Sequence, residues 1–355
     1  MHSLQLHQRL MQHLGALRLP LPKPERRNLA LLCQALAVSP NCHLATLALG
    51  LPLPDQREHL IQRLRRFLKN ERVHPTDCYR PLARHLLAHW SQREVNLVMD
   101  RTDVEDRHSI LTLGLAYQKR ILPLTWDLFD FGASDAERQG DLLQRIHPYV
   151  PSVERVRVHL YADSEFRAIS LQRTCQGYGW HWQVGLKSDL RFHTGDGQWQ
   201  MLSALNLQPG ERRYLQGIYL NRDHPLGPLS LIADWSVHQD RPRYWSLDQT
   251  ADAQAWRRGR KRYWIEPTFR DWKSYGFDLE QSRIEDPDRL NVLLLGLAFT
   301  TVWMIYLGAR LIQQGCRHEL APPDKADYSV FRLGRDYVQR CRTLGRVVPV
   351  GFAVP

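Results

Sequence analysis

The sequence predicts an α/β fold: a mixed five-stranded sheet with helices on both faces, an all-helical region before it and a β-rich insertion within it. The all-helical region is predicted because residues 1–93 show apolar residues at helical spacing, broken by Leu-Pro-Leu-Pro at 19–22 and 51–54. The mixed sheet is predicted because strand-like and helical runs follow in the order β-β-β-α-β-α-β over 94–187. The insertion is predicted because residues 188–256 consist of strand-like runs, with a hairpin signal at Asp196-Gly197.

The N-terminal region, 1–93, is expected to contain helices at 26–38, 57–70 and 80–90. Its first residues form an amphipathic segment, since His and Gln interrupt the apolar run that a signal peptide needs. In the 57–70 run, Arg63 and Arg66 lie mostly opposite the apolar face, together with Arg65 and Lys69. A solvated helix face and a DNA-contacting face remain equal alternatives for these cations.

The remaining elements follow in order along the chain. In 94–187, strands are expected at 95–100, 108–117, 121–127, 156–161 and 180–186, and helices at 136–146 and 166–176. In the insertion, 188–256, strands are expected at 190–193, 198–202, 214–220, 229–235 and 244–247. Residues 257–317 are expected to complete the sheet domain, and 318–355 to form a loosely attached helix and tail.

The 355-residue chain has a formal net charge of +11, which is distributed unevenly. The four regions in order, 1–93, 94–187, 188–256 and 257–355, have net charges of +9, −2, −2 and +6. Basic ends attract polyanions such as nucleic acid or an anionic membrane, while acidic residues in the middle could hold metal cations. Six scattered cysteines without a Cys-x-x-Cys pair favour reduced thiols and a cytoplasmic protein.

One segment, 290–309, is free of charged residues and long enough to span a bilayer. It contains Asn291, Thr300, Thr301 and two glycines, and acidic residues lie just upstream of it. These features favour a buried core helix, so the sequence predicts no membrane partner.

Three carboxylates form the sharpest candidate site: Asp100, Asp163 and Glu266. Asp100 and Asp163 each end or follow an apolar strand, and the ends of neighbouring parallel strands lie close together. Hard oxygen ligands suit Mg²⁺ or Mn²⁺, and two such ions could support phosphoryl transfer. An ordinary turn or helix cap is the alternative for a single Asp after a strand. Nearby Asp103, Glu105 and Asp106 compete for the role of Asp100.

A run of cations precedes Glu266: Arg257, Arg258, Arg260, Lys261 and Arg262. On a helix, Arg262, Glu266 and Lys273 would share a face. A surface salt bridge is the alternative, but it would not require the flanking cations, which are costly without an anionic partner.

Around Glu266 the sequence resembles the DDE transposases of bacterial cut-and-paste insertion sequences, whose third acidic residue lies in a Tyr-x2-Arg-x3-Glu-x6-Lys signature. Arg262, Glu266 and Lys273 match this signature, and Gly259 replaces its Tyr. Four further stretches are similar to that family: Ile-Glu-x-x-Phe-Arg-Asp-x-Lys-Ser (265–274), Met-Asp-x-Thr (99–102), Ala-Asp-x-x-Phe (162–166), and Arg289-Leu290 leading into a Leu-rich helix. The resemblance covers roughly residues 60–310.

The resemblance implies a ribonuclease-H-like catalytic fold, with the β insertion between the second Asp and the Glu. Asp100, Asp163 and Glu266 would be the catalytic residues and would ligate two Mg²⁺ (or Mn²⁺) ions. Arg262 and Lys273 would contact DNA phosphates near the cleaved end, with Arg258 as a further DNA-binding candidate. The implied activity is cutting of transposon ends by water and joining of the freed 3′-hydroxyl to target DNA. The partner would be double-stranded DNA, and a homodimer in the DNA complex is compatible with the sequence.

Two departures from the family pattern bear on this site. Gly259 removes whatever phosphate contact the Tyr provides. Pro267 disfavours helical geometry at Glu266, so the helix is expected to begin there with Pro267 at its first position. In that case the Arg262–Glu266 helical pairing is not guaranteed.

Other assignments remain as alternatives. A sequence-specific DNA-binding protein derived from a transposase but without cleavage activity is the main one, and an RNA-directed nuclease on the same fold is less favoured. In the insertion and just before it, Trp182, Trp199, Trp235 and Trp245 could stack on an extruded base, although core packing is favoured for any one of them. His85 and His89 have the spacing of a zinc pair but lack an evident third ligand, which favours structural histidines.

Overall fold

The N-terminal region of the computed structural model is all-helical, as predicted. Residues 2–167, 169–222, 225–322, 325 and 328–353 are described. Five helices come first: α1 (His2–Ala16), α2 (Lys23–Val38), α3 (Leu44–Leu49), α4 (Arg57–Leu68) and α5 (Pro75–Ala88). The structure therefore contains the three predicted helices and adds α1 and the short α3.

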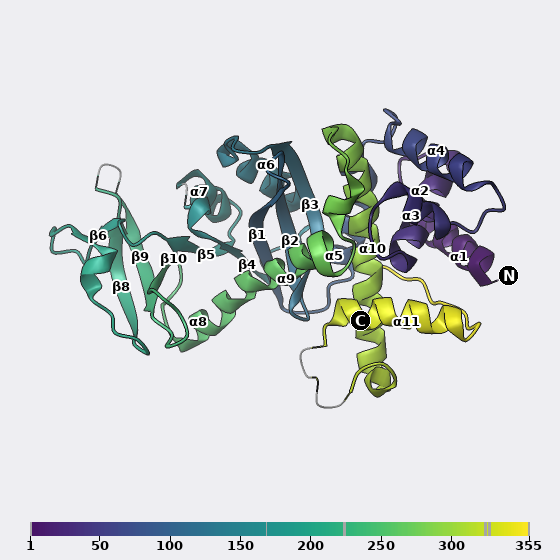
Figure 1. The fold of residues 1–355 in the computed structure, drawn as a ribbon. Coiled ribbons are helices and arrows are strands. Elements are labelled where there is room, and N and C mark those ends of the chain that lie inside the picture. Colours follow the sequence, from purple (N-terminus) through teal and green to yellow (C-terminus); the bar gives the residue numbers. More distant parts are fainter. Residues whose placement is uncertain (1, 168, 223–224, 323–324, 326–327, 354–355) are drawn as a thin grey trace.

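A mixed sheet follows the helices. Its elements are β1 (Glu94–Val104), β2 (His108–Tyr117), β3 (Arg120–Asp130), α6 (Ala136–Ile146), β4 (Arg157–Ala162), α7 (Ile169–Gly177) and β5 (His181–Leu186). The strand order is β3-β2-β1-β4-β5, with β1, β4 and β5 parallel and the first three strands an antiparallel meander. Helices α6 and α7 lie on one face and α5, α9 and α10 on the other (Figure 1). This arrangement is the predicted ribonuclease-H-like fold.

The insertion extends this sheet instead of forming a separate one. Its strands are β6 (Arg191–His193), β7 (Gln200–Met201), β8 (Arg212–Leu220), β9 (Leu226–Asp234) and β10 (Arg243–Leu247). Because β10 pairs antiparallel with β5, the sheet continues as β5-β10-β9-β8-β6-β7 and has ten strands in the described part of the chain. The outer strands bury a hydrophobic cluster of their own around Phe192 and Leu231. The insertion therefore forms a lobe joined to the five-stranded sheet through β10 (Figure 1).

The chain returns from the insertion in a nearly continuous helical run. It consists of α8 (Ala253–Gly259), a 3₁₀ turn (Arg260–Trp264), α9 (Ile265–Arg270) and a π-helical turn (Asp271–Tyr275). The 3₁₀ turn lies against β1, β2 and β4, and α9 lies against β1 and β3. This run brings the segment around Glu266 back to the first strands of the sheet.

Helix α10 (Pro287–Gln313) is the central core helix. In the described chain it alone is long and apolar enough to cross a membrane, and 94% of its apolar window is buried inside the protein. It packs against α2, α5, β3 and α11 (Val330–Thr343). The predicted core helix is therefore confirmed, and its apolar composition is explained by burial within this fold.

One hydrophobic core joins the N-terminal helices, the five-stranded sheet and α10. The boundary predicted at residue 93 thus separates segments that share this core. The prediction of a loosely attached C-terminal segment was wrong, because α11 packs on α10 and Val348, Val350 and Phe352 after it are buried. Phe352 is 4% exposed, and the Trp303 indole N–H donates to the Pro349 carbonyl at 3.0 Å.

Candidate active site

Two adjacent parallel strands place Asp100 beside Asp163. The first residue pair between β1 and β4 is Glu94 with Arg157, and the last is Met99 with Ala162. Asp100 and Asp163 are the residues that directly follow this last pair. Asp163 then leaves the sheet and caps the following turn, where its Oδ1 accepts the Ser164 N–H at 2.6 Å. The expectation that the first strand ends on Asp100 was wrong, since β1 continues along β2 to Val104. Asp100 marks the end of the parallel pairing.

The nearby acidic residues Asp103, Glu105 and Asp106 have other partners or positions. Asp103 accepts the Ser109 hydroxyl at 2.6 Å and lies 3.9 Å from Arg101. Glu105 and Asp106 occupy the β1–β2 turn, with φ of 51° and 50°. Asp100 is therefore the carboxylate of β1 that lines up with Asp163.

Packing of α9 against the sheet positions Glu266. Ile265 and Phe269 are buried, and the Thr268 hydroxyl oxygen accepts the Ile121 N–H of β3 at 3.0 Å. These contacts leave Glu266 on the exposed side of the helix, facing the ends of β1 and β4. Asp100, Asp163 and Glu266 are called the acidic triad below.

Pro267 does not begin the helix, contrary to the prediction. Helix α9 begins at Ile265, directly after the 3₁₀ turn, so that Pro267 is its third residue. Proline is tolerated in the first turn of a helix, and here Pro267 does not interrupt the helical run. The helical path through Arg262 and Glu266 is preserved, and their side chains pair.

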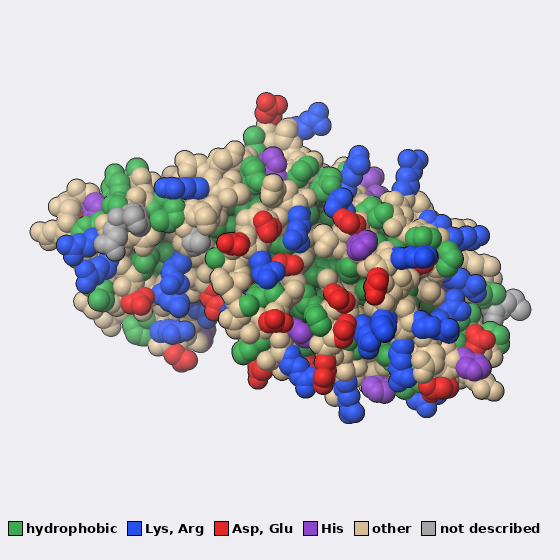
Figure 2. Space-filling view, turned by 90° about the horizontal axis from the view of Figure 1, so that it is seen from above, with side chains coloured by type: hydrophobic (Ala, Val, Ile, Leu, Met, Phe, Trp, Pro, Cys, Tyr) green, Lys and Arg blue, Asp and Glu red, His purple; other side chains and the backbone are tan. Residues whose placement is uncertain are grey.

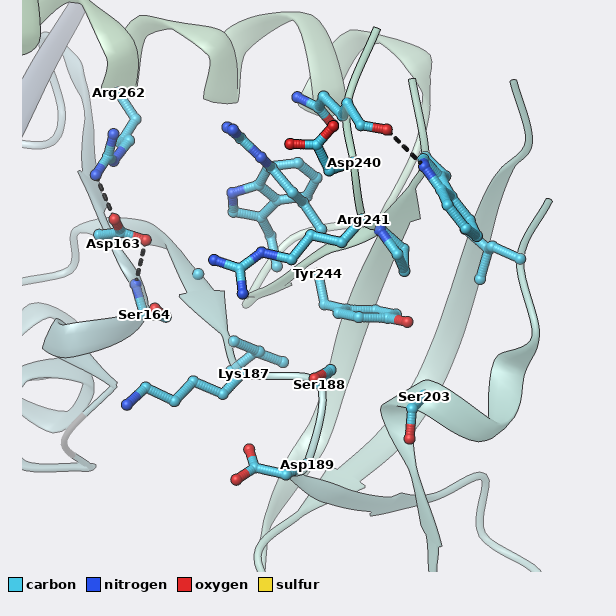
Figure 3. Close-up of a pocket in the computed structure, with 18 of the residues that line it drawn as sticks. Asp163, Ser164, Lys187, Ser188, Asp189, Ser203, Asp240, Arg241, Tyr244 and Arg262 are labelled. Atoms are coloured by element: carbon cyan, nitrogen blue, oxygen red, sulfur yellow. Dashed lines mark hydrogen bonds and ion pairs between the residues drawn. The ribbon is translucent and has the colours of Figure 1, made fainter. Parts of the chain in front are cut away.

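The Arg262 guanidinium lies between the three carboxylates of the triad. Its Nη1 is 2.5 Å from Glu266 Oε1, and its Nη2 is 2.5 Å from Asp163 Oδ2 and 3.5 Å from Asp100 Oδ2. Arg262 is only 7% exposed. Figure 3 shows the contact between Arg262 and Asp163 at the edge of a cavity. Here Arg262 binds carboxylates, whereas the resemblance implies a contact with a DNA phosphate.

Burial and charge shape the protonation of this cluster. Burial raises the pKa of Asp100 to about 6, against the lowering effect of Arg262 and of the hydrogen bond from the Arg101 N–H. Burial also works to lower the pKa of Arg262, but the acidic triad outweighs it and the pKa lies above its usual value. Arg262 is therefore a buried cation, held by the carboxylates around it.

The donor chemistry of the triad fits Mg²⁺, since all three side chains offer hard carboxylate oxygens. Even so, no group of three or more His, Cys, Asp or Glu side chains among the described residues is arranged to hold a metal as it stands. The guanidinium of Arg262 lies where the carboxylates converge. The same finding leaves His85 and His89, whose rings lie 4.2 Å apart, without a zinc site in the described chain.

The other predicted contacts around Glu266 lie away from the triad. Lys273 Nζ donates to the Asp103 carbonyl at 2.6 Å and lies 3.4 Å from Glu280, because the π-helical turn changes its direction. Arg258 donates to Gln249 at 3.4 Å. At Gly259 a Cβ would meet Gln183 Nε2 at 2.1 Å, so the Tyr of the family signature would require Gln183 to move.

The predicted cations of the N-terminal region differ in their surroundings. Arg63 of α4 is half-buried, and its Nε donates to Asn28 at 2.9 Å. Arg66 is exposed, as are Arg65 and Lys69. Figure 2 shows many Lys and Arg side chains over the end of the molecule that the N-terminal helices form. Arg66 is thus open to a partner, whereas Arg63 also serves packing.

A cavity of about 1160 Å³ separates the triad from the insertion lobe, with Asp163, Arg262 and Glu266 on one wall. Lys187 and Arg241 extend into it from the opposite wall (Figure 3), and neither side chain has a hydrogen-bond or ion-pair partner among the described residues. Sequence reasoning missed these two cations. The hairpin signals located the strands of the insertion but could not indicate which loop side chains face the triad.

Of the four tryptophans considered for base stacking, two line this cavity: Trp235 and Trp245. Trp182 is 5% exposed and belongs to the core. Trp199 packs against His193, with ring centroids 4.4 Å apart.

Comparison with known proteins assigns the chain to a family. The family model described as "Transposase DDE domain" matches residues 103–303, more than half of the chain. The search of curated proteins found no match. Among solved structures, one similar chain is described as "Cryo-EM structure of piggyBac transposase synaptic complex with hairpin DNA (SNHP)". It is 9% identical, with a TM-score of 0.44 over 94% of this chain and 76% of that chain.

Proposed function

The chain belongs to the DDE transposase family, and from that premise we propose that it cuts the ends of a DNA transposon and joins them to target DNA by phosphoryl transfer. The observation that supports this most strongly is the convergence of the acidic triad on one guanidinium. A turn or cap role would explain Asp163 alone. It would not explain why a third carboxylate returns from beyond the insertion to the same point.

The acidic triad would hold two Mg²⁺ ions, which supply a nucleophile at neutral pH and neutralise charge on the phosphodiester. The chain's own residues would do the positioning. Lys187 and Arg241 face the cavity without partners among the described residues, so they are available to bind the DNA backbone beside the triad. Arg66, with the exposed cations around it on α4, would add contacts to the duplex farther from the cut. Fixed cations and correct placement provide most of the rate enhancement in phosphoryl transfer.

Purified protein is expected to nick duplex DNA that carries the sequences flanking its own coding region, provided that Mg²⁺ is present. End-labelled DNA run on a denaturing gel measures this, with scrambled flanking sequence as the control. Chelation with EDTA should abolish nicking, and added Mg²⁺ should restore it. Specific binding without nicking in Mg²⁺ or Mn²⁺ would instead favour a DNA-binding protein derived from a transposase, and absence of binding would contradict both.

We further propose that Trp235 or Trp245 stacks on a base that is extruded near the cut, since both line the cavity beside the triad. Base stacking on an aromatic ring is worth about 1–3 kcal/mol, so loss of the stacking ring should weaken binding of transposon-end DNA by roughly 5- to 150-fold. Fluorescence of 2-aminopurine placed at the DNA end, measured for Trp235→Ala and Trp245→Ala, reports the unstacking.

The control is Trp199→Ala, which removes a half-buried tryptophan of the same lobe that lies outside the cavity lining. It should leave both the binding and the fluorescence change intact. If all three variants behave alike, the cavity is not where a base stacks.

A further inference from the structure

The two aspartates of the triad, Asp100 and Asp163, already have partners within the protein for both of their carboxylate oxygens. Asp163 Oδ1 accepts the Ser164 N–H at 2.6 Å, and its Oδ2 binds Arg262 at 2.5 Å. Asp100 Oδ1 accepts the Arg101 N–H at 2.9 Å, and its Oδ2 faces Arg262 at 3.5 Å. A metal ion bound by the Oδ2 atoms of these two aspartates would compete with Arg262 for them.

Arg262 itself is not anchored elsewhere. Its two terminal nitrogens bind only the triad, and its buried Nε has no hydrogen-bond partner among the described residues. The Tyr263 ring also lies near it, 5.1 Å from the guanidinium carbon. The position of the guanidinium therefore depends on its ion pairs with the carboxylates. A divalent cation bound by the same carboxylates would replace those ion pairs.

We propose that Arg262 is a built-in cation that closes the carboxylate site in the resting protein, and that divalent metal displaces it and so frees it for a DNA phosphate. This inference rests on the proposed function, because it takes the triad as the metal site. One side chain then has two roles, one after the other. Before metal arrives, Arg262 neutralises three converging carboxylates; afterwards, the same cation is available to the substrate.

Displacement predicts that metal and Arg262 compete, which can be measured without DNA and without activity. Mn²⁺ binding to the full-length protein, followed by isothermal titration, should be tighter for Arg262→Gln than for wild type by roughly tenfold or more, within the usual range of coupling between two sites. Without metal, Arg262→Gln should also unfold at a lower temperature, because three carboxylates lose their counter-charge. Saturating Mn²⁺ should then raise its melting temperature more than that of wild type.

The matched control is Arg260→Gln, which removes the same charge two residues away in the same 3₁₀ turn. The Arg260 side chain is exposed and lies over the Trp256 ring at 5.3 Å. Its loss should leave Mn²⁺ affinity close to that of wild type. If Arg262→Gln does not fold, Arg262→Lys is the second variant: its shorter ammonium cannot span the triad, so it should also bind Mn²⁺ more tightly than wild type.

Asp100→Asn separates failure of this inference from failure of the proposed function. If Asp100→Asn removes Mn²⁺ binding but the Arg262 variants match wild type, the triad binds metal and only the displacement is overturned. If Asp100→Asn binds Mn²⁺ as tightly as wild type, both the proposed metal site and this inference are overturned. If neither wild type nor the Arg262 variants bind Mn²⁺, both are overturned.

A second readout concerns the freed guanidinium. If metal releases Arg262 toward a phosphate, Mn²⁺ should increase the affinity for transposon-end DNA. The factor of this increase should be smaller for Arg262→Gln than for wild type. An equal factor in the two proteins would contradict the transfer of Arg262 from carboxylates to DNA.

Discussion

Replacing Asp100 by Asn is expected to reduce cleavage of transposon-end DNA by at least about 10³-fold, since the charge that a divalent ion provides at a phosphodiester is worth several kcal/mol. Asn keeps the volume of Asp100 but lacks the negative charge that would hold the ion. The fold should survive, because burial raises the pKa of Asp100 to about 6, which means that its ionisation costs the folded protein stability at neutral pH. We therefore expect the melting temperature without metal to equal or exceed that of wild type.

The control for Asp100→Asn is Asp103→Asn, three residues along the same strand. Asp103 accepts the Ser109 hydroxyl and lies 3.9 Å from Arg101, and its carboxylate has no ion pair with Arg262 among the described residues. Single-turnover cleavage rates on end-labelled DNA, with melting temperatures measured in parallel, should show a large loss for Asp100→Asn and little change for Asp103→Asn. An Asp100→Asn protein that cuts at the wild-type rate would remove Asp100 from the active site.

Much of this fold is predictable from local sequence, because buried strands are rich in apolar residues and the turns after them begin at polar residues. Strand β4 lies within the sheet and is buried from Val158 to Ala162, mostly by apolar residues, and the turn after it begins at a polar residue, Asp163. The order of strands and helices then limits the topology to a mixed sheet. That order does not indicate how the insertion joins the sheet. The β5–β10 pairing that makes ten strands depends on residues well separated in sequence.

The site was only partly predictable for a similar physical reason. Spacing alone places Arg262 and Glu266 one helical turn apart. The contact between Arg262 and Asp163 spans 99 residues, and it depends on how the helical run after the insertion crosses the sheet. Pro267 was misleading because the preceding 3₁₀ turn, rather than the proline, sets where α9 begins. Tertiary packing decided each of these points.

Helix α11 shows most clearly how packing can be hidden from sequence, and Gly334→Ala tests it. A Cβ at Gly334 would lie 1.9 Å from the Met304 carbonyl oxygen of α10, and one at Gly308 would lie 1.8 Å from the Val330 carbonyl oxygen. Both obstacles are backbone atoms, which cannot move aside as a side chain could. We therefore expect Gly334→Ala to lower the free energy of unfolding by at least about 2 kcal/mol, as overpacking does.

The sign of that change is informative, because Gly→Ala within a helix otherwise stabilises by about 1 kcal/mol. Gly140→Ala in α6 is the matched control, since a Cβ there would meet nothing within 4 Å. Denaturant unfolding should move the two variants in opposite directions, down for Gly334→Ala and up for Gly140→Ala. A loosely attached α11 would instead gain helix propensity from Ala at 334, so stabilisation by both variants would contradict the packing of α11 on α10. Since α10 also packs on β3 and α5, loss of this contact should weaken the core helix beneath the sheet that bears the acidic triad.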